Sequence, residues 1–215
     1  MRILTEHEAK ELLSKYGIPV TKENIARSAD EALAIALNIG TPVAMKISSS
    51  DISHKSDVGG VMLNIEREYV RPAYNKMISQ IKKAVPGAKI EGVLVQQMAR
   101  PGHEVIVGLK KDAQFGHALM FGLGGIFVEV YRDVSFRVTP IDGKEALEMI
   151  SEIKGYPILK GIRGKRPADI DAIVRVLVSV SDMAKKENII ELDINPLIVN
   201  ESGAIAVDSR AMMDE

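Results

Sequence analysis

Apolar residues recur at helical spacing in two segments near the start of the chain, residues 9–16 and 32–39. Each segment follows four residues in which a hydroxyl precedes a glutamate by three positions, TEHE at 5–8 and SADE at 28–31. That spacing is typical of a capping box, in which the two side chains bind the first free amides of a helix. A glycine follows each apolar segment, so both helices are predicted to end there.

Three later segments have the same apolar spacing. They cover residues 74–84, residues 146–153 after Asp142, and residues 170–184 after Asp169. An aspartate before an apolar run can accept a hydrogen bond from the first helical turn. Both aspartates are therefore predicted to begin their helices.

Elsewhere, alternating or β-branched residues lie between short turns, which is typical of strands. The predicted strands cover residues 42–47, 92–98, 103–111, 117–123, 126–133, 135–141, 189–199 and 204–210. The last two are separated by a turn and are predicted to form a terminal hairpin. Helices combined with a mainly antiparallel sheet predict an α+β fold, divided near residue 95. A cleft between two such parts is a common place for a ligand.

Composition narrows the class of protein. The chain has 215 residues and a formal net charge of −1, so one composite domain or two small lobes is expected. The balanced charge and the few aromatic residues argue against nucleic-acid binding. The sequence has no cysteine, which excludes disulfides and thiolate metal sites. With no apolar leader and no uncharged stretch long enough for a bilayer, a cytoplasmic protein is expected.

The predicted terminal hairpin carries a candidate metal site. Asp193 and Asn195 are two residues apart and so point to one face of a strand, while Asp208 lies on the returning strand. Mg²⁺ selects oxygen ligands, usually one or two carboxylates together with phosphates. A solvated strand face beside a turn would have the same pattern, so spacing alone leaves both interpretations open.

Two other features are compatible with a phosphorylated ligand. Lys46 lies on the polar face of an apolar strand, where a lysine can bind phosphate, although many strands simply end in lysine. Gly122, Gly124 and Gly125 let the backbone approach a ligand closely. The segment matches neither a Walker loop nor a dinucleotide fingerprint, and a strand junction relieved by glycine would look the same.

A further polar cluster lies between two predicted strands. Gln96, Gln97 and Met98 close the first strand and Glu104 opens the second. These side chains could contact a nucleobase edge or a ribose hydroxyl. The alternative is a hairpin with solvent-exposed polar ends.

Together, five segments resemble the ATP-grasp superfamily, and specifically the beta subunits of ADP-forming acyl-CoA synthetases of the acetate–CoA ligase type. The segments are TEHEAKELLSKYGIPV, PVAMKISSSDISHKSDVGGV, VLVQQMARPGHEVIVGLKKDAQFGHALMFGLGGIFVEV, GIRGKRPADIDA and ELDINPLIVNESGAIAVDSRA. The resemblance covers nearly the whole chain and implies one ATP-grasp domain over residues 1–215. About residues 20–95 would form a small lobe, residues 1–19 and 96–215 a larger lobe, with the nucleotide cleft between them.

The resemblance also implies ATP or ADP and Mg²⁺ as cofactors and a role for each candidate residue. The implied roles are phosphate binding for Lys46, a hinge beside the adenine for Gln96, Gln97 and Met98, ribose binding for Glu104, a phosphate-side lining for Gly124 and Gly125, and Mg²⁺ binding for Asp193, Asn195 and Asp208. Gln96 stands where related succinate–CoA ligases often have glutamate.

The segment SDISHKSDVGG places His54 among small polar residues and before a glycine pair. In the family that it resembles, a phosphoryl group passes from a histidine of a partner alpha subunit to ADP. His54 matches a second histidine, proposed to carry that group on a mobile loop. A neutral imidazole can accept a phosphoryl group, and a pKa of about 6.5 allows the neutral form at cellular pH. An ordinary exposed loop histidine is the alternative.

The implied reaction converts acyl-CoA, ADP and phosphate reversibly to an organic acid, CoA and ATP. It would require an alpha subunit that carries the CoA-binding and CoA-ligase domains and handles CoA, in an α₂β₂ assembly. Two alternatives are an ATP-grasp carboxylate–amine ligase, which would not need His54, and a nucleotide-sensing regulatory subunit. The basic segment 160–166 could contact nucleotide, CoA or the alpha subunit, or be solvated.

Overall fold

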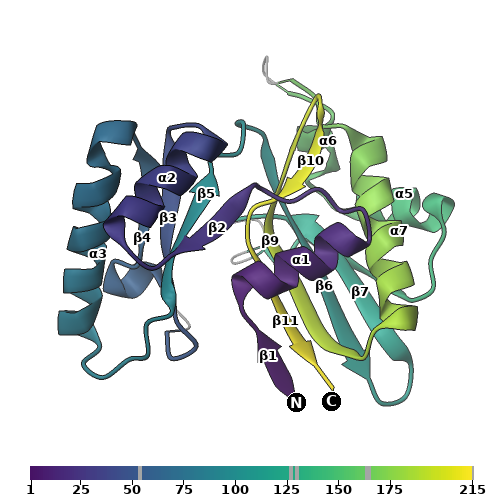
Figure 1. Cartoon of the computed structure of the whole chain (residues 1–215). Helices are drawn as coiled ribbons and strands as arrows, with labels where there is room; N and C mark the ends of the chain where they lie inside the picture. Colours follow the sequence, from purple (N-terminus) through teal and green to yellow (C-terminus); the bar gives the residue numbers. More distant parts are fainter. Residues whose placement is uncertain (53–54, 126–127, 129–130, 163–165, 215) are drawn as a thin grey trace. The chain divides into compact units, whose positions relative to one another are not determined.

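A computed structural model describes residues 1–52, 55–125, 128, 131–162 and 166–214 of the chain. The chain folds into two compact units (Figure 1). Unit 1 contains Met1–Val20 and Ala99–Glu215, and unit 2 contains Thr21–Met98. Unit 2 is therefore a single insertion into the chain of unit 1.

Unit 1 is built on an antiparallel sheet. Among the described residues its strands follow the order β1-β11-β9-β6-β7-β8, with β10 pairing with β9. The strands are β1 (Arg2–Leu4), β6 (His103–Asp112), β7 (Gly116–Leu123), β8 (Val134–Val138), β9 (Ile189–Asn200), β10 (Gly203–Ala206) and β11 (Ser209–Met213). Among the described residues, the helices of this unit are α1 (Glu6–Lys15), α5 (Gly143–Glu152), α6 (Tyr156–Leu159) and α7 (Ile170–Lys186).

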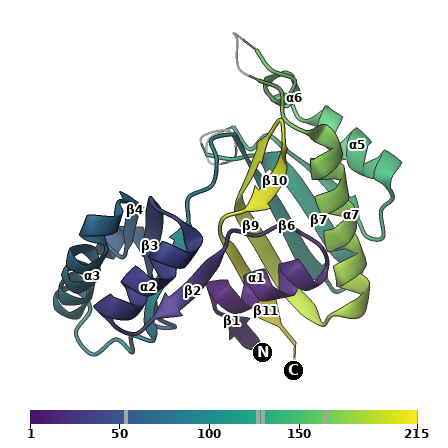
Figure 2. The ribbon, with the colours of Figure 1, turned by 45° about the horizontal axis from the view of Figure 1, so that its top comes forward.

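The apolar core of unit 1 lies on one face of this sheet. Leu109 of β6 pairs with Leu119 of β7 and with Leu192 of β9, and all three are buried with residues of α1, α5 and α7. Figure 2 shows these helices beside the sheet. Because side chains alternate along a strand, the neighbouring residues Gly108 and Asp193 lie on the opposite face. That opposite face carries the polar candidates.

Unit 2 has its own sheet and core. Within the described residues, its strands follow the order β2-β5-β3-β4. Its elements are β2 (Glu23–Ala26), α2 (Ala29–Ile39), β3 (Val43–Ser48), the 3₁₀ turn η1 (Ser56–Val58), β4 (Val61–Ile65), the turn η2 (Arg67–Tyr69), α3 (Val70–Ala84) and β5 (Gly92–Gln97). Met45, Ile47 and Val95 pack with α2 and α3 on one face of the sheet.

The predicted caps at Thr5, Ser28, Asp142 and Asp169 are confirmed, with one difference at Ser28. Thr5 and Asp142 each form a full capping box, and Asp169 accepts a hydrogen bond from the Ala172 amide. Ser28 likewise accepts a bond from the Glu31 amide. The prediction that Glu31 accepts a hydrogen bond from the Ser28 backbone amide is wrong. The Glu31 carboxylate instead accepts from the backbone amide of Arg27. Ser28 therefore caps the helix with a single bond.

Several predicted elements differ in the structure. The described residues 128 and 131–133 of the predicted strand 126–133 are not in a strand. The helix predicted over 74–84 begins at Val70, and β1, β2 and β4 were not predicted. The terminal hairpin is confirmed for β9 and β10, but the returning chain breaks at Val207 and Asp208 and continues as β11. None of the described helices is both long and apolar enough to cross a membrane.

Candidate functional site

The three candidate metal ligands lie at an irregularity in β9. Val105 of β6 pairs with Leu197 and Val107 pairs with Ile194, so β9 has one extra residue in this interval and bulges at Asn195. Bulges redirect side chains and are common beside functional sites. The Asn195 backbone amide donates to the carbonyl oxygen of Asp208 at 3.1 Å. This bond holds the irregular residues between β10 and β11 beside the bulge. The structure thus brings the backbones of Asn195 and Asp208 together.

Asp193 is half-buried on the same strand, on the face away from the helices. Burial raises the pKa of the Asp193 carboxyl to about 6, with Arg210 opposing the shift and the neighbouring carboxylates Asp208 and Glu191 adding to it. The Ser209 hydroxyl donates to the Asp193 carbonyl oxygen at 3.0 Å. The acids are therefore close enough to repel one another in a partly dehydrated place.

Glu104, near the start of β6, contacts the glycine-containing segment 122–125 at the end of β7. The Gly124 amide donates to the Glu104 carbonyl oxygen at 2.8 Å. A side chain at Gly124 would come within 3.1 Å of the Glu104 Cβ, so this close approach favours glycine. Asp193 pairs with Gly108, four residues farther along β6, which corresponds to roughly 13 Å of strand. Gly124 is thus beside the predicted ribose residue rather than beside Asp193.

The candidates of unit 2 share one face of its sheet. Ala44 pairs with Gln96 across β3 and β5, and Lys46 follows two residues later on the same face as Ala44. Lys46 is only 6% exposed and Gln96 only 1% exposed. The Gln96 side-chain amide donates to the Thr21 hydroxyl at 2.8 Å. Lys46 and Gln96 therefore lie on the face opposite the apolar core of unit 2.

Gln97 and Met98 lie at the end of unit 2 that leads back to unit 1. The Gln97 backbone amide donates to the Lys22 carbonyl oxygen at 2.8 Å, and Met98 is half-buried. Two neighbouring backbone segments are therefore tied together where the chain leaves unit 2.

His54 lies outside the described residues, but both stems of its segment are described. The Ser48 hydroxyl donates to the Glu91 carboxylate at 3.1 Å, and the Lys89 amide donates to the Asp51 carboxylate at 2.7 Å. On the far side, the Gly60 amide donates to the Lys55 carbonyl oxygen at 2.7 Å. The Ile47 amide of β3 also donates to the Gly60 carbonyl oxygen at 2.8 Å, so hydrogen bonds within unit 2 hold the residues on either side of His54.

Some residues of structural importance were not singled out from the sequence. The buried Asp133 carboxylate accepts hydrogen bonds from the backbone amides of Lys154 and Gly155 at 2.8 and 2.7 Å. These bonds hold the residues before β8 against the start of α6. Lys10 and Glu6 form a buried ion pair at 3.2 Å on α1. Their spacing of four residues on a helix was visible in the sequence as a possible pair. The partner of Asp133 is a backbone, which no sequence pattern reveals.

Comparison with known proteins decides the family. The sequence-family model of the ATP-grasp domain matches residues 1–213 of the chain. The chain belongs to the ATP-grasp family. The predicted family and the predicted α+β ATP-grasp fold are thereby confirmed, and the fold is also supported by closely similar solved structures.

Among ATP-grasp proteins, the chain is similar to subunits of acetate–CoA ligases. The beta subunit of acetate–CoA ligase [ADP-forming] II from Pyrococcus furiosus is 50% identical, over 98% of this chain and 91% of that protein. Acetyl-coenzyme A synthetase 1 of Candidatus Korarchaeum cryptofilum, in complex with coenzyme A, Ca-AMPCP and HgCl⁺, has a TM-score of 0.96 and 48% identity over 99% of this chain and 94% of its own.

A second structure of the Korarchaeum enzyme contains coenzyme A and Mg-AMPPCP, with a phosphohistidine segment that points towards the nucleotide binding site. Its TM-score is 0.87 and its identity is 45%, over 99% of this chain and 93% of its own. An ATP analogue and Mg²⁺ thus occur in an ATP-grasp protein close to this one. The prediction of ATP or ADP and Mg²⁺ as cofactors agrees with that finding.

The donor chemistry of β9 and the following break fits Mg²⁺. Asp193 and Asp208 supply carboxylate oxygens and Asn195 supplies an amide oxygen, which are hard ligands. The mutual repulsion that contributes to the raised pKa of Asp193 is relieved by a divalent cation. Across the described residues, no three His, Cys, Asp or Glu side chains gather as a metal site by themselves. The predicted site therefore depends on Asn195 as well as on the acids.

Proposed function

We propose that this chain is the nucleotide-binding subunit of an ADP-forming acyl-CoA synthetase and forms ATP from ADP while a partner cleaves acyl-CoA. The observation that carries the proposal is the identity of about half of the residues, over nearly the full length, with a beta subunit of such a ligase. Lys46 and Gln96 in unit 2 and Glu104 and Asp193 in unit 1 fit the proposal, because each pair lies on the face of its sheet opposite the core.

The proposed reaction has four steps, of which the last two involve this chain. Phosphate displaces CoA from acyl-CoA in the partner, and a partner histidine takes the phosphoryl group from the acyl phosphate and releases the acid. The phosphoryl group then passes to a nitrogen of His54, and the β-phosphate oxygen of ADP attacks it to give ATP and free imidazole. The alternatives of a carboxylate–amine ligase and of a sensing subunit have no support among these relatives, which are named as ligases or synthetases.

Each candidate residue has a positioning or charge-neutralising task in the transfer. Lys46 provides a buried positive charge for the phosphates, and Glu104 accepts hydrogen bonds from the ribose hydroxyls. Asp193, Asn195 and Asp208 hold Mg²⁺, which when bound neutralises charge on the phosphate oxygens. Such electrostatic positioning supplies most of the catalysis in phosphoryl transfer.

Gln96, Gln97 and Met98 contribute a hinge beside the adenine in this proposal. The amide of Gln96 is held by Thr21, so its orientation is fixed before the nucleotide arrives. Gly124 rests against Glu104 and Gly125 has open space beside it, and the two glycines are proposed to line the phosphate side of the nucleotide. The protein is proposed to act in the cytoplasm with an alpha subunit in an α₂β₂ assembly.

The test is phosphoryl transfer from [γ-³²P]ATP to the chain, in the presence of Mg²⁺ and the alpha subunit. Wild type should take up an acid-labile, alkali-stable label that is lost in His54→Ala. The His117→Ala variant is the matched control, because the His117 ring contacts the Ile189 carbonyl oxygen within unit 1 and its loss should leave labelling intact. Unchanged labelling and turnover in His54→Ala would refute the relay, and wild type that binds no Mg-ADP would refute the assignment itself.

A further inference from the structure

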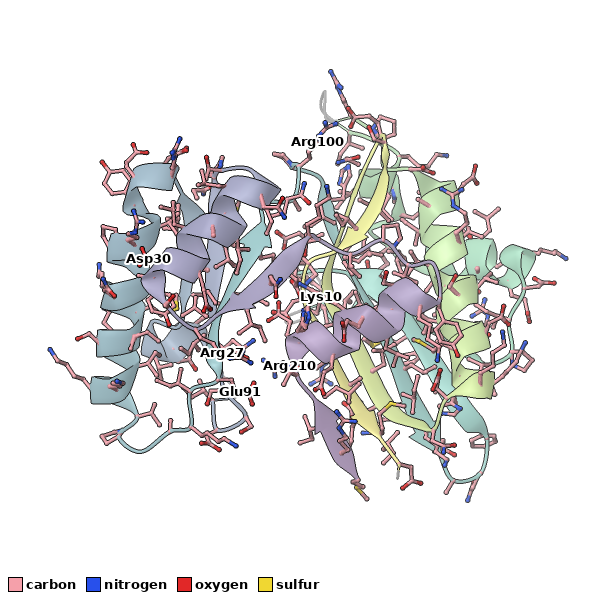
Figure 3. All side chains as sticks on the ribbon, in the orientation of Figure 1. Lys10, Arg27, Asp30, Glu91, Arg100 and Arg210 are labelled. Carbon is pink, nitrogen blue, oxygen red and sulfur yellow. The ribbon has the colours of Figure 1, made fainter. Side chains whose placement is uncertain are left out.

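Lys160 and Arg166 lie in unit 1 at the two ends of a cationic segment whose residues 163–165 lie outside the described residues. The sequence from 160 to 166, KGIRGKR, has four cationic residues and no acid in a chain of net charge −1. Arg100, on the segment before β6, lies close enough to Glu201 to influence its carboxylate, and Arg166 forms an ion pair with the same residue. Figure 3 shows Arg100 near the turn between β9 and β10. Two separate segments therefore bring positive charge to one place.

Hydrogen bonds hold the described ends of the segment 160–166. The Ala168 amide donates to the Leu159 carbonyl oxygen at 2.8 Å and closes the segment between them. His103 Nε2 lies 3.0 Å from the Arg166 carbonyl oxygen, and the Asp169 amide donates to the Asn200 carbonyl oxygen at 2.9 Å. The cations at its ends are therefore carried on a fixed frame, which lowers the entropy lost on binding a partner.

The segment that carries Arg100 lies directly against β9 at Gly102. A side chain added at Gly102 would lie 2.5 Å from the Val199 carbonyl oxygen, so glycine lets the segment rest directly on the strand. Arg100 and the described ends of the segment 160–166 are thus attached to the same two strands, β6 and β9. Their spacing is set by unit 1 alone.

The exposed side chains have the composition of a protein-binding surface. The Arg166 side chain is 79% exposed, and Ile162 is exposed beside Lys160. An exposed branched apolar residue near a cationic residue is typical of an interface, where the apolar residue is covered and the charges form the rim. A small anionic ligand would instead be expected in a concave site with converging polar groups.

The position separates this surface from the proposed phosphate site. His103 begins β6, whereas the Asp193 partner Gly108 lies five residues later, roughly 16 Å along the strand. The nucleotide phosphates proposed to lie at Asp193 therefore do not account for these cations, and the ribose proposed to bind Glu104 carries no negative charge for them to bind.

We infer that Arg100, Lys160, Ile162 and Arg166 form a docking surface for an acidic surface patch with an apolar centre on the alpha subunit. The inference rests on the proposed function, which requires a second subunit to supply the phosphoryl group. Positive charge on one partner and negative charge on the other accelerates encounter and fixes orientation. Ile162 would then be buried against an apolar residue of the alpha subunit.

The test measures binding of the full chain to immobilised alpha subunit. In the variant R100E/K160E/R166E, the association rate at low salt should fall on the order of 10–100-fold, because rim charges act mainly on association. At about 1 M salt, where the screening length is about 3 Å, this difference should largely disappear. The variant I162S should instead speed dissociation, since it removes apolar contact from the interface.

The matched control is K144E/R175E/K185E, which reverses the same number of charges on α5 and α7. Its association rate with the alpha subunit should be much closer to that of wild type than the rate of the docking variant is. Each variant is also tested for binding of Mg-ADP in the absence of the alpha subunit. Unchanged nucleotide binding shows that the variant is folded and that the docking defect is separate. The neutral variant R100Q/K160Q/R166Q provides a second test that does not add negative charge beside Glu201.

Two results would overturn the inference. The first is a docking variant that associates no more slowly than the control variant. The second is binding of CoA alone to the wild-type chain that is lost in the docking variant, since the cations would then be a phosphate site for a small ligand. Failure of the wild-type chain to bind Mg-ADP would instead contradict the proposed function, and that outcome is visible before any variant is made.

Discussion

Lys46 is a buried cation on a strand whose residues are all buried. If its ammonium binds nucleotide phosphate, Lys46→Met should weaken ADP binding by about 10–100-fold, because a hydrogen bond to a charged group contributes about 1.5–3 kcal/mol. Methionine retains most of the apolar stem, so the fold should persist. Isothermal titration with Mg-ADP measures the effect.

The comparison variant for Lys46 is Lys83→Met on α3, which removes an exposed lysine from the same unit. It should bind Mg-ADP as wild type does. Equal affinities for the two variants would show that Lys46 has no role in binding the phosphates.

The buried pair of Lys10 and Glu6 concerns stability. The two side chains are 2% and 4% exposed, so removing one charge leaves the other in a place with little water. Lys10→Met should lower the free energy of unfolding by about 3–5 kcal/mol, whereas Glu6→Leu combined with Lys10→Met should cost less than the sum of the single changes. Denaturant unfolding of the three variants gives the coupling. Additive losses would mean that the two residues do not act as a pair.

The capping box of α1 shows what a local pattern can determine. The backbone amide of Thr5 donates to the Glu8 carboxylate at 2.8 Å, and this bond is the largest cause that lowers the pKa of Glu8 below 4.5. A lowered pKa means that Glu8 stabilises the fold above its ordinary pKa and that this contribution disappears as the pH falls through the folded value.

Glu8→Ala should therefore lower the melting temperature at neutral pH and have less effect in acid that protonates Glu8. The control is Glu11→Ala, an exposed substitution on the same helix. Thermal unfolding followed by circular dichroism at several pH values measures both. A loss that is independent of pH would contradict the role of the carboxylate.

Elements with local signals were predictable, and elements defined by distant partners were not. The helices after Thr5, Asp142 and Asp169 begin where their caps place them, because a cap needs only residues three positions away. Strands β1 and β2 are short, and their exposed residues give no clear alternation. They form because β11 and β5 offer edges for pairing, and neither edge is visible locally.

The same limit applies to the site. The pairing of Asp193 and Asn195 on one strand was visible as a spacing of two, but the bulge that follows Ile194 depends on the register with β6. The predicted strand 126–133 had suitable residues, yet at its end Asp133 binds two backbone amides of a later segment. Gln96 was visible as a polar residue, whereas its partner Thr21 is distant in sequence.

At the scale of the whole molecule, unit 2 is one uninterrupted segment with a sheet and a core of its own. A fragment of Thr21–Met98 should therefore fold without the rest of the chain and unfold cooperatively, although a domain of this size is expected to be only marginally stable. Amide dispersion in a heteronuclear NMR spectrum and a sigmoidal denaturant curve are the readouts.

A fragment truncated after α3, which lacks the strand β5 that lies between β2 and β3, serves as the control and should be unfolded. If the Thr21–Met98 fragment itself shows narrow amide dispersion in its NMR spectrum, folding of its core requires unit 1.

Unit 1 closes by pairing the beginning of the chain with its end, since Arg2 lies opposite Met213 and Leu4 opposite Ala211. During synthesis the first strand therefore has no partner until residues 209–213 have been made. Unit 2, whose sequence lies between the two strands, has by then been made in full. A ribosome paused before residue 209 would hold a complete unit 2 flanked by an open sheet, and synthesis of residues 209–213 would complete the edge of unit 1.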